Sequence, residues 1–202
     1  MADGKTLSDY HGYVFDVQGR RMVGDFERMY QDEDKGGFDS WYERDLRPLR
    51  KIIALQLLSQ YNYGSILEVG CGKGTLTHLL KRKNNRVVGV DLSQNAIAKA
   101  KASYPDIDFR VMTAEQAGEI RERFDITVVM GVFAYVEGWK DCLAKYVAQA
   151  GYGLVAEFVP PNPIGFVKSI DDLTGTFGSL YEIESKIVID DTFCLLFGKS
   201  RK

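Results

Sequence analysis

The chain has 202 residues, of which 45% are hydrophobic and 27% charged, proportions typical of a soluble globular domain with its own core. Its 26 Lys and Arg residues nearly balance 28 Asp and Glu residues, which argues against the basic surface of a nucleic-acid-binding protein. The longest apolar stretch, Ile126 to Val136, has about half the ~20 residues that a membrane helix needs. Because the N-terminus also lacks a signal-peptide pattern, we expect a cytoplasmic protein without nucleic-acid or membrane partners.

The first part of the chain differs in composition from the rest. Eight of the 24 aromatic residues lie before position 45, and an acidic stretch runs from Asp25 to Asp45. Pro48 indicates the start of a long helix that ends at about Tyr61. Because the segment is too short to form a domain, we expect residues 1–48 to form a lid or flanking helices on a core of residues 49–202.

From Ser65 onward, β-branched runs alternate with helical patterns. Ser93 is a predicted helix cap, and the spacing of Thr113 and Gln116 is that of a capping box. The strands are predicted at 65–69, 86–91, 107–112, 125–130 and 152–159, and the helices at 75–82, 94–103, from 113 and at 138–150, the last closed by Gly151. This alternation indicates an α/β fold with a mostly parallel sheet and helices on both faces.

The end of the chain departs from this alternation. Two apolar runs, residues 180–189 and 192–198, flank Asp190 and Asp191. Two strand patterns joined by so short a polar turn predict a β-hairpin. We therefore expect the parallel sheet to finish with an antiparallel strand.

The stretch SILEVGCGKGTL, residues 65–76, joins a predicted strand to a predicted helix and has the spacing G-x-G-x-G. Ligands of open α/β sheets bind beyond the carboxyl ends of the strands, where this stretch lies. Glycines let the backbone turn sharply and approach a ligand closely. Seventeen residues after Gly74, Asp91 ends the second strand, where a carboxylate accepts hydrogen bonds from both hydroxyls of an adenosine ribose. The pattern predicts a nucleoside-binding site without a ribose 2′-phosphate.

Three segments, ILEVGCGKGTL, VVGVDLS and FDITVVMGVFAYV, resemble the first, second and fourth motifs of class I S-adenosylmethionine-dependent methyltransferases. The resemblance covers about residues 50 to 199 and implies a Rossmann-like, seven-stranded sheet with an antiparallel last strand. It implies that S-adenosyl-L-methionine is the cofactor. In this resemblance Asp91 holds the ribose hydroxyls, Leu92 lies on the adenine, and Glu68 orients the loop and, through water, the amino group of the cofactor. The remaining cofactor contacts that it implies are Gly70, Cys71, Gly72, Gly74, Thr113, Ala114 and Met130.

Some positions depart from the family pattern. The segment from Met112 to Glu115 lacks the Asp that often receives the adenine amino group, so this contact passes to Thr113 or to a backbone carbonyl. Lys73 has two interpretations, a contact with the cofactor carboxylate or, preferred here, a solvated side chain. Cys71 is interpreted as a small buried residue rather than a nucleophile. With Cys142 and Cys194 it forms neither a disulfide framework nor a zinc site, and we expect no metal.

Methyl transfer from a sulfonium depends mainly on alignment and the exclusion of water, and a base helps when the acceptor is a hydroxyl. The candidate catalytic residues are Tyr135 after the fourth strand, Glu157 near the end of the fifth, and His11 on the lid. Glu157 has an equally good interpretation as a structural, hydrogen-bonded acid. His78 lies in the middle of a predicted helix, where a packed side chain is expected.

The aromatic N-terminal segment favours a small or carbohydrate-like acceptor, because aromatic rings stack on sugar faces. The segments PPNPIGFVKSIDDL and FERMYQDEDKGGFDSWYERD resemble, more loosely, small bacterial methyltransferases of surface-polysaccharide and nodulation-factor synthesis. This resemblance implies methylation of an oxygen or nitrogen of a sugar or amino sugar. We expect a small-molecule substrate, a sugar or nucleotide sugar, and a monomer or homodimer.

Other functions on the same scaffold are an aminopropyl transferase and a non-catalytic, cofactor-binding partner subunit. A nicotinamide dehydrogenase is disfavoured because its glycine spacing is G-x-G-x-x-G.

Overall fold

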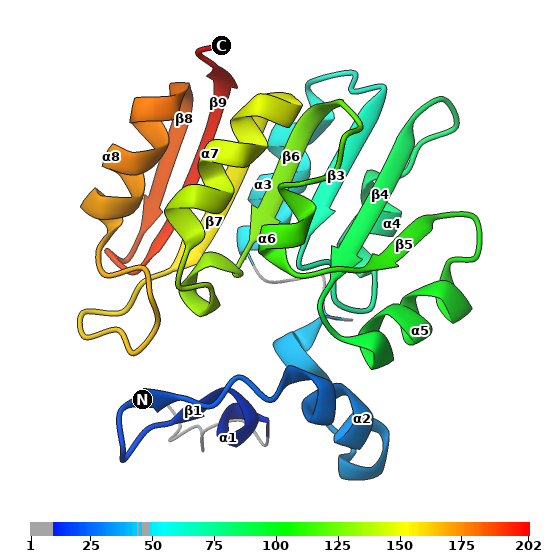
Figure 1. Ribbon diagram of the computed structural model, residues 1–202, viewed down its shortest axis with the longest axis vertical. Coiled ribbons are helices and arrows are strands. Elements are labelled where there is room, and N and C mark those ends of the chain that lie inside the picture. Colours follow the sequence, from blue (N-terminus) through cyan, green and yellow to red (C-terminus); the bar gives the residue numbers. More distant parts are fainter. Residues whose placement is uncertain (1–9, 44, 46–48) are drawn as a thin grey trace.

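The computed structural model describes residues 10–43, 45 and 49–202. Its centre is a seven-stranded sheet with the strand order β5-β4-β3-β6-β7-β9-β8. Figure 1 shows α6, α7 and α8 in front of this sheet and α3 and α4 behind it. The predicted α/β fold with helices on both faces is therefore confirmed.

The parallel part of the sheet follows the predicted alternation closely. Apolar, β-branched strands are buried between the two helical layers, as expected for a parallel sheet. The elements are β3 (Ser65–Val69), α4 (Thr75–Leu80), β4 (Arg86–Asp91), α5 (Gln94–Ser103), β5 (Asp108–Val111), α6 (Ala114–Ala117), β6 (Phe124–Met130), the 3₁₀ turn η2 (Phe133–Tyr135), α7 (Trp139–Gln149) and β7 (Ala150–Phe158). The predicted cap at Gly151 is wrong, because α7 passes directly into β7 and Gly151 lies within that strand.

The C-terminal part contains α8 (Ile170–Leu180), β8 (Tyr181–Ile189) and β9 (Phe193–Ser200). β9 lies between β7 and β8 and pairs antiparallel with both, so it alone runs against the other strands of the sheet. Asp190 and Asp191 have φ values of 50° and 51°, the left-handed conformation of a tight hairpin turn. The predicted hairpin and antiparallel last strand are confirmed, whereas α8 had not been predicted.

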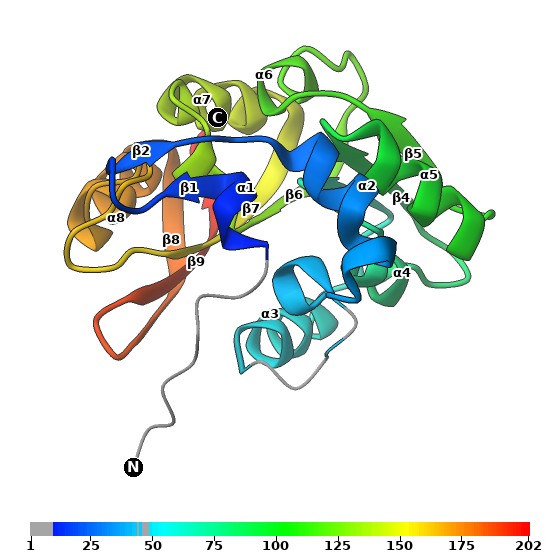
Figure 2. The same ribbon diagram turned by 90° about the horizontal axis from the view of Figure 1, so that it is seen from below.

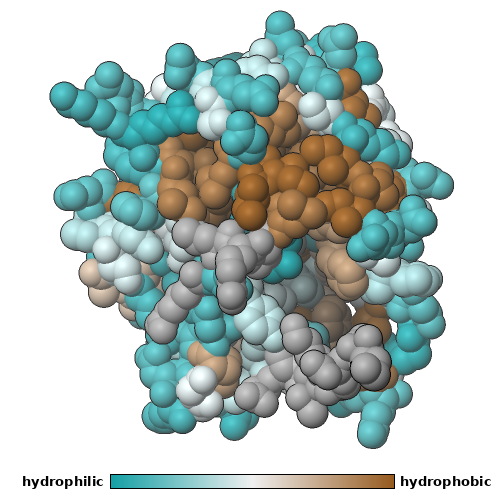
Figure 3. Space-filling view, turned by 180° about the vertical axis from the view of Figure 1, so that it is seen from behind, coloured by the Kyte–Doolittle hydropathy of each residue, from teal (hydrophilic) through white to brown (hydrophobic). Residues whose placement is uncertain are grey.

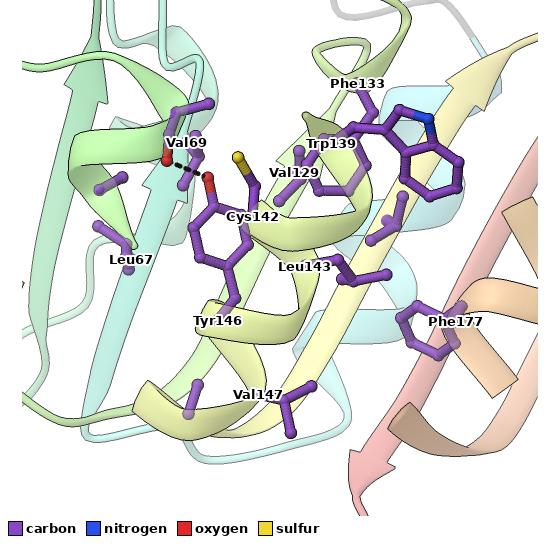
Figure 4. Close-up of a cluster of buried hydrophobic side chains, with 14 of the residues drawn as sticks. Leu67, Val69, Val129, Phe133, Trp139, Cys142, Leu143, Tyr146, Val147 and Phe177 are labelled. Atoms are coloured by element: carbon purple, nitrogen blue, oxygen red, sulfur yellow. Dashed lines mark hydrogen bonds between the residues drawn. The ribbon is translucent and has the colours of Figure 1, made fainter. Parts of the chain in front are cut away.

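Two apolar layers hold the sheet between its helices. The cluster under α6, α7 and α8 contains Tyr146 and Phe177, both fully buried, and Figure 4 shows their side chains directed at the sheet. The cluster on the opposite face includes Ala54 and Leu58 of α3. Seen from this opposite side, the molecule also carries a patch of apolar surface (Figure 3).

The N-terminal segment lies across one end of the sheet, beneath the strand ends in Figure 1, and Figure 2 views it from below. A short two-stranded hairpin occurs here although the sequence shows no strand pattern. Pro48, the predicted start of the long helix, lies outside the described residues. The elements are α1 (His11–Val14), β1 (Phe15–Asp16), β2 (Arg21–Met22), α2 (Phe26–Gly36), the 3₁₀ turn η1 (Ser40–Tyr42) and α3 (Leu49–Ser59).

Candidate functional site

The glycine loop follows β3, and its three glycines all have positive φ values, 75° at Gly70, 53° at Gly72 and 81° at Gly74. L-residues with side chains rarely adopt this conformation. A Cβ on Gly70 would lie 2.2 Å from Val132, and one on Gly74 would lie 2.5 Å from Phe109. At these two positions glycine is therefore required by close packing within the protein as well as by the turn.

Gly72 differs because its open side faces the N-terminal segment. A Cβ there would lie 2.7 Å from Oε2 of Glu43 and 2.9 Å from the hydroxyl oxygen of Tyr30. Glu43 and Tyr30 are both buried. The N-terminal segment thus contacts the part of the loop where the sequence places a ligand.

Asp91, at the end of β4, connects neighbouring strand ends. Its Oδ2 accepts a hydrogen bond of 2.9 Å from the Gly72 amide, and its Oδ1 accepts one of 2.9 Å from the Ser93 amide. Burial raises the pKa of Asp91. Leu92, the predicted adenine contact, is 49% exposed beside it. The structure therefore brings Asp91 and Leu92 to the glycine loop, as the sequence predicts.

Glu68 is buried on β3, the strand that leads into the glycine loop. Its Oε2 accepts a hydrogen bond of 2.5 Å from the Thr77 hydroxyl. Burial raises the pKa of Glu68 to about 8, and the charges of Glu43 and Asp91 add to this effect. The ligand-free protein consequently favours the protonated form of this carboxyl group.

This pKa predicts how stability depends on pH. An acid whose pKa is raised by folding stabilises the protein while it is protonated, and this contribution is lost as the pH rises through the folded-state pKa of about 8. We expect Glu68→Gln to flatten the fall in unfolding free energy between about pH 5 and 8 by a few kcal/mol, since each pKa unit is about 1.4 kcal/mol. Thermal unfolding of both proteins across this range is the measurement. An unchanged pH slope in Glu68→Gln would contradict it.

The other predicted cofactor contacts lie at the ends of β5 and β6. The Thr113 hydroxyl accepts a hydrogen bond of 3.3 Å from the Gln116 amide, so Thr113 caps α6 in the predicted capping box. The backbone carbonyl of Ala114 accepts a hydrogen bond of 2.7 Å from the Tyr146 hydroxyl, drawn in Figure 4. Met130 ends β6 and is partly buried. These residues therefore lie at or just after the carboxyl ends of two strands of the same sheet, and Thr113 also has a structural role as the cap of α6.

Cys71 is buried in the loop, and burial raises the pKa of its thiol. A thiol in such surroundings is a poor nucleophile, which agrees with its interpretation as a small buried residue. Lys73, in contrast, corrects the sequence interpretation, because its side chain is buried rather than solvated. Its Nζ pairs with Glu33 and, at 2.5 Å, with Oδ1 of Asp39. Lys73 therefore joins the glycine loop to the N-terminal segment.

Glu157, near the end of β7, is fully buried beside the fourth strand end. Its Oε1 accepts hydrogen bonds of 2.9 Å from the Val132 amide and 2.7 Å from the Phe133 amide. Its Oε2 is buried and has no hydrogen-bond partner among the residues that the structure describes. Burial raises the pKa of Glu157 to about 7. One oxygen thus has the predicted structural role, while the other is left to accept a proton or a hydrogen bond.

Tyr135 lies near Glu157 and is surrounded by aromatic rings of the N-terminal segment. Its ring centroid is 5.7 Å from that of Phe15 and 5.4 Å from those of Phe26 and Trp41. Burial, followed by the charge of Glu157, raises the pKa of the Tyr135 hydroxyl. The structure therefore brings two of the three candidate catalytic residues together, beneath the N-terminal segment.

The third candidate, His11, has different neighbours from Tyr135 and Glu157. Its ring meets Tyr10 edge-on at 5.2 Å, and burial lowers its pKa. Within the described part of the chain, no hydrogen bond or ring contact joins His11 to Tyr135 or Glu157. His78, by comparison, stacks on the ring of Tyr104 with the centroids 4.4 Å apart, but its side chain is exposed rather than packed in the core as expected.

Sequence reasoning missed the residues of the N-terminal segment that reach the site. Glu43 contacts the loop, and Glu27 accepts hydrogen bonds of 2.5 Å from the Ser93 hydroxyl and 2.6 Å from the Asn95 side chain. The only signal was the acidic and aromatic composition of this segment. Composition alone does not predict which carboxylate accepts a hydrogen bond from which amide group 30 to 68 residues away in the chain.

Residues 66–150 match the family described as "Methyltransferase domain", and they span β3 to the start of β7 with the glycine loop and Asp91. This match covers less than half of the chain. A ubiquinone biosynthesis O-methyltransferase of Bradyrhizobium diazoefficiens is 38% identical over 99 residues, which are 47% of this chain and 35% of that relative. The chain thus spans about a third of this relative's length.

Solved structures share the fold of the sheet and its flanking elements. The N-methyltransferase NodS from Bradyrhizobium japonicum WM9, in complex with S-adenosyl-L-homocysteine, has a TM-score of 0.65 at 17% identity, covering 77% of this chain and 90% of that one. A TehB-like S-adenosylmethionine-dependent methyltransferase from Corynebacterium glutamicum has a TM-score of 0.64 at 19% identity, covering 88% and 97%. The predicted Rossmann-like fold is confirmed.

The helices of the described residues are short. None of them has both the length and the apolar character that crossing a bilayer requires.

Proposed function

We propose that the chain transfers a methyl group from S-adenosyl-L-methionine to an oxygen or nitrogen atom of a small, carbohydrate-like acceptor. The observation that carries this proposal is the meeting of the glycine loop, Asp91, Tyr135 and Glu157 at one sheet edge, under the N-terminal segment. The cofactor supplies a methyl group already activated by its sulfonium charge. The protein then contributes alignment and the exclusion of water, worth up to ~7–11 kcal/mol in well-oriented systems.

The residues present fit this cofactor in charge and in hydrogen bonding. Each oxygen of Asp91 accepts one amide hydrogen bond and keeps a further lone pair for a ribose hydroxyl. Burial raises the pKa values of Glu68 and Asp91, so a ligand that brings positive charge favours their ionised forms. Leu92 would lie on the adenine. The other proposed cofactor contacts are Gly70, Cys71, Gly72, Gly74, Thr113, Ala114 and Met130.

Glu157 is the proposed base for a hydroxyl or ammonium acceptor. Its Oε1 is fixed by two amides, and its unpartnered Oε2 is left to accept the proton. Tyr135 would orient the acceptor beside it. His11 remains a weaker candidate, because it needs a movement of the N-terminal segment to join the other two residues.

The aromatic rings around Tyr135 support an acceptor with a flat face, and a sugar or nucleotide sugar has one. Phe15, Phe26 and Trp41 all come from the N-terminal segment. We propose that residues 1–48 act as a lid that completes the acceptor site and excludes water, since lids have this role in many enzymes. Residues 49–202 would form the cofactor-binding core.

The test is incubation of the purified protein with methyl-labelled S-adenosyl-L-methionine and a panel of sugars, nucleotide sugars, phenols and small amines. Label in a sugar or nucleotide sugar supports the full proposal. Label only in a phenol keeps the methyltransferase and overturns the carbohydrate-like acceptor. The two alternatives have separate signatures: transfer from decarboxylated cofactor to a polyamine indicates an aminopropyl transferase, and tight cofactor binding without any transfer indicates a non-catalytic partner subunit.

A further inference from the structure

The carboxylate of Glu43 lies on the glycine loop. Its Oε2 accepts a hydrogen bond of 3.0 Å from the Lys73 amide, and its Oε1 accepts one of 3.3 Å from the Thr75 amide. Both oxygens therefore bind loop amides, and the side chain is buried. Together with the Tyr30 hydroxyl, it covers the open side of Gly72.

A carboxylate at this position has unfavourable surroundings apart from those amides. Burial raises the pKa of Glu43 to about 7, and the negative charge of Asp91 also opposes ionisation of Glu43. Backbone amides bind an ionised carboxylate more strongly than a neutral group. The loop amides thus bind one carboxylate, which in this structure belongs to Glu43 of the N-terminal segment.

The backbone immediately before Glu43 is held in a strained conformation. Trp41 and Tyr42 have φ values of 62° and 49°, in the left-handed region that large side chains disfavour. Such strain persists only where surrounding contacts hold it in place. The hydrogen bonds of Glu43 to the loop are contacts of this kind, together with those that Lys51 donates to the carbonyl oxygens of Tyr42 and Glu43.

We propose that Glu43 is an internal competitor of the cofactor: its carboxylate takes the place on the loop amides that the carboxylate of the cofactor's amino-acid end takes in the loaded protein. This inference rests on the proposed function. Cofactor entry then requires Glu43 to leave. The rest of the lid stays attached through the ion pairs of Lys73 with Glu33 and Asp39.

Release of Glu43 from the loop would also affect the position of an aromatic ring beside Tyr135. Trp41 lies two residues before Glu43, and its ring is 5.4 Å from that of Tyr135. Relaxation of the strained pair would move this ring.

The experiment compares two ligands with two variants. Calorimetry measures the affinity of S-adenosyl-L-homocysteine and of 5′-methylthioadenosine, which lacks the amino-acid end, for the wild type, Glu43→Ala and Glu27→Ala. Glu27 is the matched control because it also ties the lid to the core, at Ser93 and Asn95, but binds no glycine-loop amide. If Glu43 holds the loop amides about 90% of the time, its removal should tighten S-adenosyl-L-homocysteine binding about tenfold. The affinity of 5′-methylthioadenosine should stay the same, and Glu27→Ala should not tighten binding of either ligand.

Each other result overturns the proposal. Equal tightening of both ligands, or the same gain in Glu27→Ala, means that the lid is merely loosened. Unchanged affinity means that Glu43 does not compete, and weaker binding means that Glu43 holds the cofactor's ammonium group. Glu43→Gln, which keeps the side-chain size and weakens its bonds to the amides, should show the same direction if Glu43→Ala does not fold. A wild type that binds neither ligand overturns the proposed function as well, whereas binding without the Glu43 effect overturns only this inference.

Discussion

Gly72→Val is expected to lower the affinity for S-adenosyl-L-homocysteine by about a hundredfold or more, which is at least ~2.7 kcal/mol. A branched side chain at φ 53° costs about 1–3 kcal/mol of backbone strain. Its Cβ would also occupy the space that Glu43 and Tyr30 now reach, 2.7 and 2.9 Å away. Whichever group lies there in the loaded protein, a valine excludes it.

Calorimetric titration of the folded variant is the measurement, with circular dichroism to confirm that the sheet is intact. Gly175→Val is the matched control, because Gly175 lies in α8 with open space around its Cβ position and without a positive φ. The control should bind as the wild type does. Tight binding by a folded Gly72→Val protein would show that this side of the loop does not face the cofactor.

Glu157→Gln is expected to lower kcat by about 10²–10⁴, the range for loss of a general base. Glutamine keeps an oxygen for the Val132 and Phe133 amides, but its amide group cannot take a proton where Oε2 now lies without a partner. The affinity for S-adenosyl-L-homocysteine should remain within about twofold of the wild type, since among the described residues no hydrogen bond joins Glu157 to the glycine loop.

The pH profile separates a base from a purely structural acid. With the acceptor that the labelling panel identifies, kcat of the wild type should rise as Glu157 ionises with its pKa of about 7, because the base acts in its deprotonated form. This rise should disappear in Glu157→Gln. A variant with full activity, or one whose lost activity is matched by a lower unfolding temperature, would leave Glu157 with the structural role alone.

The strands and the glycine loop were predictable from sequence because their signals are local. Each strand is a short apolar run, and Asp91 ends one such run 17 residues after Gly74, so a parallel sheet brings both to the same edge. The helix α8 was not predicted, although Ser169 caps it and Leu173 and Phe177 lie four residues apart on its buried side. Its glycines and threonines are weak helix formers, and burial against β8 and β9 outweighs that preference.

The contacts between the N-terminal segment and the glycine loop could not be predicted in the same way. Lys73 follows a glycine in an exposed-looking turn, and its burial depends on Glu33 and Asp39, 40 and 34 residues earlier. Although burial alone would raise the pKa of Glu33, the hydrogen bonds from Lys73 and Lys99 keep it below its usual value. Such pairings depend on how the N-terminal segment is placed over the strand ends, and no local spacing encodes that placement.

The central claim is that the edge formed by the glycine loop and Asp91 binds the nucleoside of S-adenosyl-L-methionine, and calorimetric titration of the wild type and Asp91→Ala with S-adenosyl-L-homocysteine tests it most directly. The wild type should bind saturably. Asp91→Ala should bind more weakly by about 1.5–3 kcal/mol, the range for hydrogen bonds to a charged group. No saturable binding by the folded wild type, or unchanged affinity in folded Asp91→Ala, would contradict the claim.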